Sequence, residues 1–463
     1  MKPVRNLLPA LLMIVLFACT KESFTTNPAD RLNTSEDTLH FDTVFTSTGS
    51  ISQVVKIINN NNNNIKVSSV KIAGGNNSFF KINVDGTPGP EVKNVDIAAN
   101  DSAYVFVTVS INPNANNLPF LVRDSIEVSY NGNRKFIQLD AFGRNAHFFR
   151  DRTISANETW NNDIPYVILG KLIVDTNASL SINKGCRIHF HADAPFIVNG
   201  SLKVNGEKAD SSRVIFTGDR LDEPYRDFPG SYPGILFSSS SKDNILNYAI
   251  VKNAYQGLVV LEPSTNTKLT LNETIIDNAF DIGLLGINTS ISAINLLVSN
   301  CGKDIVLLKG GNYDFTHCTA VSYSNNYVQH KDPVMIVTNF LTENGVNVSR
   351  PLNAIFRNSI FWSDPNGIVD NEVVVQVLGS NPPVQFDHIL WRVQTNPSNS
   401  TVSGAINQDP SFETIDNGQR IYNFRLKPNS PAINKGINAA VSLDLDGNPR
   451  TVGLPDLGAY EKQ

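Results

Sequence analysis

Near the C-terminus, acidic and amide side chains alternate as the first ligands of a calcium loop do. Asp444, Asp446 and Asn448 stand at every second position around a glycine. Position twelve of such a loop, where a bidentate acid belongs, is Pro455. Asp and Asn also bond to their own backbone in turns, and glycine supplies the positive φ. We therefore favour a turn, and we keep calcium, the one cofactor that the sequence suggests, as the alternative.

A second candidate is the segment RIHFHAD, in which His189, His191 and Asp193 stand two residues apart. On a β-strand such positions point the same way, so these side chains could meet on one face. A zinc site needs three or four ligands and a supporting shell of hydrogen bonds. Since the sequence supplies no obvious fourth ligand, we expect an exposed polar strand face.

The third candidate is a charged loop, TGDRLDEPYRDFPG, at residues 217–230. A tyrosine beside arginines and acids would suit sugar hydroxyls or uronate groups, and long loops often carry binding sites. A polar loop is equally what solvent requires. A second excursion, residues 327–351, is ambiguous in the same way. The candidate binding residues in the first loop are Arg220, Asp222, Tyr225, Arg226 and Asp227.

These segments belong to a repetitive part of the chain. Asn253, Asn278 and Asn300 each follow a short apolar run, at spacings of 25 and 22 residues. Repeats of this length built from short β-branched strands predict a solenoid, and the leucine consensus of leucine-rich repeats is absent. We therefore expect a parallel β-helix. The recurrent asparagines would form a structural ladder that bonds neighbouring coils, and not a binding site.

In the preceding residues, 37–145, the pattern of strand-like runs repeats over a shorter distance. Strand-like runs alternate with polar turns every 8 to 12 residues, as in an Ig-like β-sandwich. Six consecutive asparagines, Asn59 to Asn64, are expected to form a loop between two paired strands because Asn accepts positive φ. The chain is thus expected to be all-β, with a sandwich followed by a β-helix.

The N-terminus reads as a targeting segment. A basic start and an apolar run at residues 7–16 lead to Cys19, in a context that resembles the lipobox of bacterial lipoproteins. We predict a signal peptide over residues 1–18, lipid attachment at Cys19 and a polar tether over residues 19–36. The membrane would then be a partner through this anchor. The alternative is an ordinary secretory signal with a chance cysteine.

Charge and cysteine content exclude other classes. Without the two basic residues of the leader, 36 of the 38 remain against 43 acidic ones, a net charge of −7. No basic patch with interleaved aromatics suggests nucleic acid. Besides Cys19 the chain has Cys186, Cys301 and Cys318, an odd number without metal-binding spacing. We expect these three to be buried free thiols.

From residue 160 onward the chain resembles a known family. The opening PYVILGKLIVDTNASLSINKGCRIHFHADAPFIVNGSLKVNG is similar to right-handed parallel β-helix repeat proteins of Bacteroidetes. The tail, with NSPAIN and LGAYE, resembles their C-terminal choice-of-anchor Q pattern. The resemblance implies a right-handed β-helix over residues 160–405 and a closing cap over residues 406–463. Lys21-Glu22, after Cys19, resembles the signal that sends Bacteroidetes lipoproteins to the outer face of the outer membrane, so surface display of an outer-membrane lipoprotein is a hypothesis.

Two functions remain. We favour a lipid-anchored cell-envelope protein that presents its β-helix for ligand binding, adhesion or assembly, towards glycans or another envelope protein. The alternative is a carbohydrate-active enzyme, a polysaccharide lyase or hydrolase on acidic polysaccharide. No catalytic residues can be named, because no acid recurs in register and fold similarity alone does not establish an activity.

Overall fold

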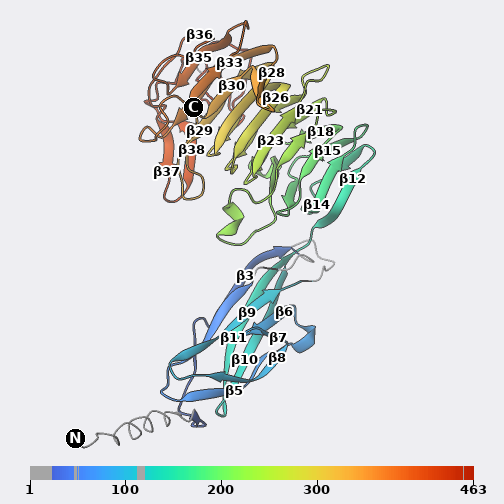
Figure 1. Ribbon diagram of the computed structural model, residues 1–463, viewed down its shortest axis with the longest axis vertical. Coiled ribbons are helices and arrows are strands. Elements are labelled where there is room, and N and C mark those ends of the chain that lie inside the picture. The colour runs from blue at the N-terminus through green and yellow to red at the C-terminus, as the bar shows by residue number, and fades with distance from the viewer. Residues whose placement is uncertain (1–22, 46–49, 51, 112–119, 452) are drawn as a thin grey trace, which may run out of the picture. The chain divides into compact units, whose positions relative to one another are not determined.

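A computed structural model describes residues 23–45, 50, 52–111, 120–451 and 453–463. The predicted signal peptide and Cys19 lie outside these residues. The chain divides into two compact units, with the boundary in the sequence between Asn145 and Ala146. In the described residues the regular structure is β throughout, apart from three short 3₁₀ turns (Figure 1). These turns are η1 (Gly75–Asn77), η2 (Asp210–Ser212) and η3 (Tyr225–Asp227).

The N-terminal unit is a β-sandwich of two sheets. The strands of the first sheet are β1 (Phe24–Thr25), β3 (Thr38–Phe45), β5 (Asn64–Ile72), β8 (Glu91–Ile97), β10 (Phe120–Tyr130) and β11 (Asn133–Arg144). Those of the second are β2 (Asn33–Thr34), β4 (Gln53–Asn59), β6 (Phe80–Val84), β7 (Thr87–Gly89) and β9 (Asp101–Val109). Alternate side chains of these strands are apolar and fill one core between the sheets.

Two details of this unit differ from expectation. The tether predicted over residues 19–36 is wrong for residues 23–36, because β1 pairs with β5, β2 pairs with β4, and Leu32 is buried. The asparagine run does not join paired strands, since β4 and β5 lie in different sheets. Asn59 is buried there, and its amide donates to the carbonyls of Asn63, Ile97 and Ala98.

The second unit is a parallel β-helix, as predicted, in which strands pair with strands of the next coil (Figure 1). Its pairing begins at β12, before residue 160. The 23 strands of its sheet are β12 (His147–Ile154), β13 (Glu158–Trp160), β14 (Tyr166–Val174), β15 (Ser179–Asn183), β16 (Arg187–Phe190), β17 (Phe196–Val198), β18 (Ser201–Asn205), β19 (Val214–Gly218), β20 (Ile235–Phe237), β21 (Asn244–Asn247), β22 (Ala249–Lys252), β23 (Gln256–Leu261), β24 (Leu269–Asn272), β25 (Ile275–Asp277), β26 (Ile282–Ile294), β27 (Leu297–Ser299), β28 (Lys303–Thr316), β29 (Thr319–Ser322), β30 (Met335–Thr338), β33 (Leu352–Ser363), β34 (Val373–Gln376), β35 (Val384–Trp391) and β36 (Ser400–Ser403).

The coils turn at residues in the left-handed conformation, which Asn adopts more readily than most residues. One such corner, here called the ladder corner, consists of Asn253, Asn278 and Asn300, with φ of 64°, 57° and 52°. A second, the cap corner, consists of Tyr248, Glu273, Asn295, His317 and Asn358. Between the two corners run β22, β25, β27 and β29, so one narrow face of the β-helix is bounded by both.

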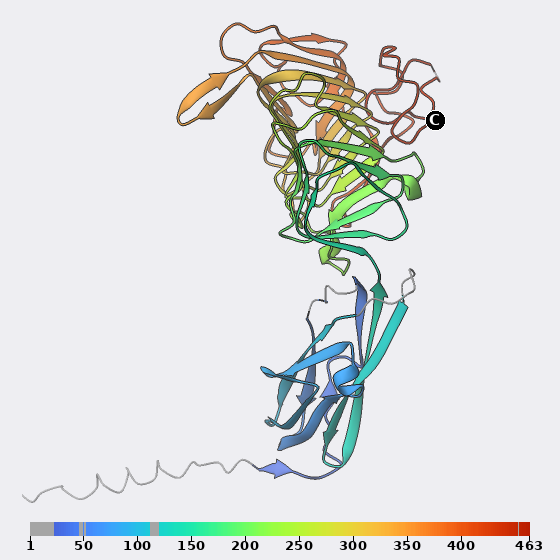
Figure 2. The same ribbon diagram turned by 90° about the vertical axis from the view of Figure 1, so that its right-hand side faces the viewer.

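The C-terminal segment covers this narrow face. It includes the hairpin of β37 (Phe412–Asp416) and β38 (Ile421–Leu426) and lies along the side of the β-helix (Figure 2). Its apolar side chains pack on outward-facing ones of successive coils, and this cluster includes Leu297, Val321, Ile360, Leu390, Phe412, Leu426, Leu445 and Leu457. The expectation that the C-terminal segment closes the end of the solenoid is wrong. The segment lies on the side of the β-helix because burying the outward-facing apolar side chains there is favourable.

A smaller hairpin, β31 (Phe340–Glu343) with β32 (Val346–Ser349), projects from the β-helix on another side (Figure 2). It forms part of the second excursion, residues 327–351. Its strands pair only with each other.

Candidate functional site

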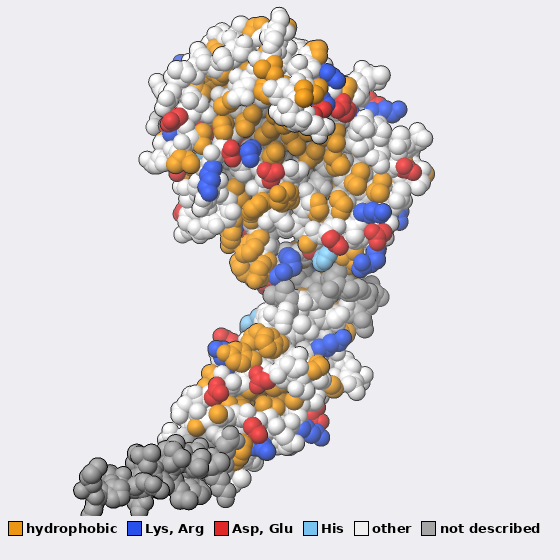
Figure 3. Space-filling model, in the orientation of Figure 1, with side chains coloured by type: hydrophobic (Ala, Val, Ile, Leu, Met, Phe, Trp, Pro, Cys, Tyr) orange, Lys and Arg blue, Asp and Glu red, His pale blue; other side chains and the backbone are white. Residues whose placement is uncertain are grey.

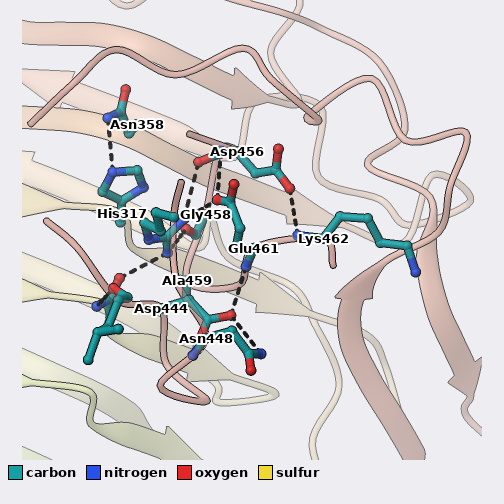
Figure 4. A network of polar contacts seen from close by, with 12 residues as sticks. His317, Asn358, Asp444, Asn448, Asp456, Gly458, Ala459, Glu461 and Lys462 are labelled. Carbon is teal, nitrogen blue, oxygen red and sulfur yellow. Dashed lines mark hydrogen bonds and ion pairs between the residues drawn. The ribbon is translucent and has the colours of Figure 1, made fainter. Parts of the chain in front are cut away.

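Asp444 forms a turn of the cap (Figure 4). One of its oxygens accepts the backbone amides of Asp446 and Asn448, at 2.9 and 2.7 Å, and the other accepts that of Glu461 at 2.9 Å. Asp446 instead binds Arg425 through both oxygens. The carboxylates are therefore engaged by the protein itself, which favours the turn over the calcium loop. In the described part of the chain, no group of three metal-binding side chains could hold an ion.

His189, His191 and Asp193 do not share one site. His189 is buried and its Nδ1 lies 3.1 Å from the carbonyl of Gly218. His191 follows the end of β16, is exposed, and contacts Asp219 at 2.7 Å. The predicted exposed polar strand face is therefore wrong, because His189, the one of the three that lies on β16, is buried, whereas the exposed His191 and Asp193 lie beyond the end of that strand.

The asparagines of the ladder corner do link coils. The amide of Asn278 donates to the side-chain oxygen of Asn253 at 2.8 Å. The same two amides also reach the charged loop, where Asn253 donates to the carbonyl of Arg226 at 2.8 Å and Asn278 to that of Asp227 at 3.0 Å. The ladder thus joins the coils and also fixes the loop that lies over them.

Internal contacts hold the loop's candidate residues. Arg220 binds Asp222 through two hydrogen bonds and stacks over Tyr225, with 4.2 Å between guanidinium and ring centre. Arg226 pairs with Glu223 at 2.6 Å. Arg226 also contacts Asp227 at 3.3 Å, so all five predicted side chains make contacts within the loop. Of the five, Asp227 also approaches Lys252, which lies beside the ladder corner.

Asp227 lies on the wall of a polar cavity of about 200 Å³. The other walls come from the ladder corner, the strands beside it and the cap hairpin, and the lining residues are Lys252, Asn253, Asp277, Asn278, Asn300, Asn325, Gln419, Arg420 and Tyr422. From the sequence, we expected the loop to bind a ligand, the ladder to join the coils and the cap to close the solenoid. The structure brings one or more residues from each into a single site, here called the ladder cavity.

Contacts between these elements hold the ladder cavity in shape. Arg420 donates to the carbonyl of Asp227 at 3.1 Å and stacks over Tyr327 at 4.6 Å. Tyr327 in turn packs on Phe228, with 4.6 Å between ring centres. The second excursion, of which Tyr327 is the first residue, therefore buttresses the cavity, whereas its hairpin β31–β32 does not line it.

The electrostatics of the ladder cavity favour hydrogen-bonding or anionic groups. Lys252 lies 3.7 Å from Asp227. Burial raises the pKa of Asp277, against the opposing hydrogen bond from Ser299 and the charge of Lys252. Asp277 therefore holds its proton more readily than an ordinary carboxyl. The cavity is lined by two cationic side chains, Lys252 and Arg420, and by the carboxyl groups of Asp227 and Asp277.

Sequence reasoning missed Lys252, Asp277 and the cap residues Gln419, Arg420 and Tyr422. The first two directly precede ladder asparagines, in VKNA and IDNA, so their position beside the ladder is visible in the repeat. The cap residues carry no such signal, because they come from a hairpin more than a hundred residues further along the chain.

No family model and no curated protein matches the chain. Among solved structures, a family 123 glycoside hydrolase from Clostridium perfringens is similar over 25% of this chain and 26% of its own, with 13% identity and a TM-score of 0.18. The PapD-like domain 7 of human CEP192 is similar over 31% of this chain and 96% of its own, with 9% identity and a TM-score of 0.17. The match thus spans about a quarter of the hydrolase, and scores this low indicate neither fold nor function.

Cys186, Cys301 and Cys318 are free and buried, as expected. Burial raises the pKa of Cys186 to about 11 and that of Cys318 to about 12, so both stay protonated and unreactive. In the residues that the structure describes, no helix is long and apolar enough to cross a membrane.

Proposed function

We propose that this protein is a lipid-anchored cell-envelope protein that binds a glycan through the ladder cavity. The observation that carries the proposal is the convergence of amide, carboxyl, cationic and phenolic side chains from three distant segments on one cavity. Sugars present many hydroxyls in fixed directions, so they need a dense set of donors and acceptors. The volume of the cavity is below the roughly 300 Å³ of common ligand sites, so it suits one sugar unit.

The two cationic side chains support a sugar that carries an acidic group. Lys252 and Arg420 would face a carboxylate or sulfate, and the raised pKa of Asp277 weakens the repulsion from that carboxyl. The asparagines would bind ring hydroxyls beside it.

The polysaccharide lyase is the second candidate, favoured by the same cations. A lyase needs a base that is neutral at working pH. Burial raises the pKa of Tyr422, and Arg420 is already engaged by the Asp227 carbonyl and the Tyr327 ring. Both make poor bases, which leaves Lys252 as the candidate base. Because Lys252 pairs with Asp227 at 3.7 Å, binding without bond cleavage is the better-supported function.

Native affinity gels that contain polygalacturonate, alginate, chondroitin sulfate, laminarin or hydroxyethylcellulose test the proposal. We expect an acidic polymer to retard the protein, and Lys252→Ala with Arg420→Ala to abolish the retardation. Lys203→Ala, on an outward position of β18 away from the ladder cavity, is the control. The proposal fails if no polymer retards the wild type. Release of unsaturated ends, seen by absorbance, would instead establish the lyase.

A further inference from the structure

Two aromatic side chains stand exposed on adjacent coils beside the ladder corner. Tyr255 follows Asn253 by two residues and is 48% exposed, and Phe280 follows Asn278 by two and is 51% exposed. Their rings stack, with centroids 5.6 Å apart and planes 25° from parallel. Large apolar side chains that are this exposed and lie together indicate a binding surface more often than isolated ones do.

The surroundings of this pair are polar. Gln256 donates to Asp281 at 2.8 Å, and Lys303 lies 3.8 Å from Asp281 and 3.4 Å from Asp332. On the visible face of this unit, hydrophobic side chains gather in broad areas with a few charged side chains among and beside them (Figure 3). Two stacked rings with a hydrogen-bonding rim are too small for a stable protein interface, which buries about 800 Å² on each partner. They match the size of one sugar ring, whose apolar face packs on aromatic faces while its hydroxyls reach outward.

The aromatic pair also adjoins the loop that walls the ladder cavity. Gly230 ends that loop and donates to the Ala254 carbonyl at 3.2 Å. A Cβ atom on Gly230 would lie 3.5 Å from Phe280 and 4.0 Å from Tyr255. The loop therefore has Asp227 on the cavity and Gly230 on the rings, so a chain-like ligand could contact both places.

We infer that Tyr255 and Phe280 form a stacking subsite for a second pyranose unit of the glycan in the ladder cavity. This inference rests on the proposed function. The ligand is then an oligosaccharide or polysaccharide and not a free monosaccharide. One sugar unit fills the ladder cavity, and the next unit packs on the rings of Tyr255 and Phe280.

The test compares Tyr255→Ala/Phe280→Ala with the wild type in affinity gels that contain polygalacturonate, alginate or chondroitin sulfate. We expect the dissociation constant for the polymer that retards the wild type most to rise about tenfold. Phe136→Ala, a ring on the sandwich that is 47% exposed, should change nothing. Circular dichroism establishes that each variant is folded.

The outcomes separate this inference from the proposed function. If the double variant binds as the wild type does while Lys252→Ala/Arg420→Ala does not, the stacking subsite is wrong and the ladder cavity stands. If no polymer binds the wild type, both fail. If the wild type self-associates in sedimentation and the double variant does not, the rings form an interface between copies and the inference is overturned.

Discussion

At the scale of single residues, Asp304 is a carboxyl buried in the β-helix. Its oxygen accepts the Cys301 amide and the Ser322 hydroxyl, each at 3.2 Å, and burial holds its pKa well above the ordinary value. The folded protein therefore retains a proton that the unfolded chain releases near pH 4. The stability from this group is present at low pH and is lost as pH rises through the folded pKa.

We predict that Asp304→Asn gains stability relative to the wild type as pH rises. The variant has no carboxyl to ionise, so its melting temperature should exceed that of the wild type by more at pH 8 than at pH 5. Scanning calorimetry at both values measures this. An equal difference at the two pH values would contradict the prediction.

His317, at the cap corner, makes the protein less stable as pH falls, whereas Asp304 makes it less stable as pH rises. Burial and the nearby charge of Arg450 lower its pKa to about 3, whereas an unfolded histidine titrates near about 6.5. The unfolded chain therefore binds a proton that the folded protein does not, and stability falls as pH falls from about 6.5 to about 3. His317 has φ of 55°, a value that asparagine accepts.

We therefore predict that His317→Asn weakens the acid dependence of stability. The difference in unfolding free energy between wild type and variant should move in favour of the variant between pH 7 and pH 4.5, as urea titrations would show. His40→Asn, on an exposed histidine of the sandwich, is the control. A difference that does not vary with pH would refute the assignment.

At the scale of elements, the cap is held to the β-helix by a buried arginine. Arg450 pairs with Glu461 at 3.1 Å and donates to the Asn295 side chain at 2.9 Å and the Gly458 carbonyl at 3.0 Å. Its methionine variant would leave the buried Glu461 without its cation, which costs about 3–5 kcal/mol. The cap should detach before the coils unfold.

Limited proteolysis and urea unfolding check this prediction. Arg450→Met should expose cleavage sites within residues 406–463 under conditions in which the wild type is resistant. Arg425→Met, which removes a half-exposed pair with Asp446, should cost at most about 1 kcal/mol. Equal protease resistance of Arg450→Met and the wild type would show that apolar packing and the other hydrogen bonds to the coils hold the cap without Arg450.

A second prediction concerns the stability of variants of Asn278, in the ladder corner. Asn278→Gly keeps the left-handed φ of 57° but removes the amide bonds, which should cost about 1 kcal/mol each. Asn278→Val loses the same bonds and must also adopt a conformation that β-branched residues avoid, at about 1–2 kcal/mol more. Thermal melts that rank valine level with glycine would show that the corner tolerates any side chain.

At the scale of the whole molecule, the proposed lipid anchor is testable by itself. Cys19 lies outside the described residues, so the prediction rests on its sequence context. Cys19→Ala should lose acyl-chain labelling and move from the membrane to the soluble fraction, because stable anchoring depends on the attached chains. Thr20→Ala is the matched control. A Cys19→Ala protein that still sediments with membranes would disprove the anchor.

Features that repeat locally could be predicted from the amino-acid sequence alone. Short β-branched runs separated by polar turns are enough to predict strands, and the change of period separates the sandwich from the β-helix. Asn253, Asn278 and Asn300 could be placed in register because stacked coils bring equivalent positions together. The turn at Asp444 was also predictable, since its backbone bonds span only a few residues.

The position of the cap, and the cavity that it helps to form, could not be predicted from the sequence. Leu297, Val321 and Ile360 face outward, and a cap segment covers them because exposed apolar rows are costly. That docking brings Arg420 against the carbonyl of Asp227, 193 residues earlier in the chain. No local pattern encodes such a contact, since it depends on how many coils intervene and how they stack. The ladder cavity therefore follows from long-range packing and not from any motif.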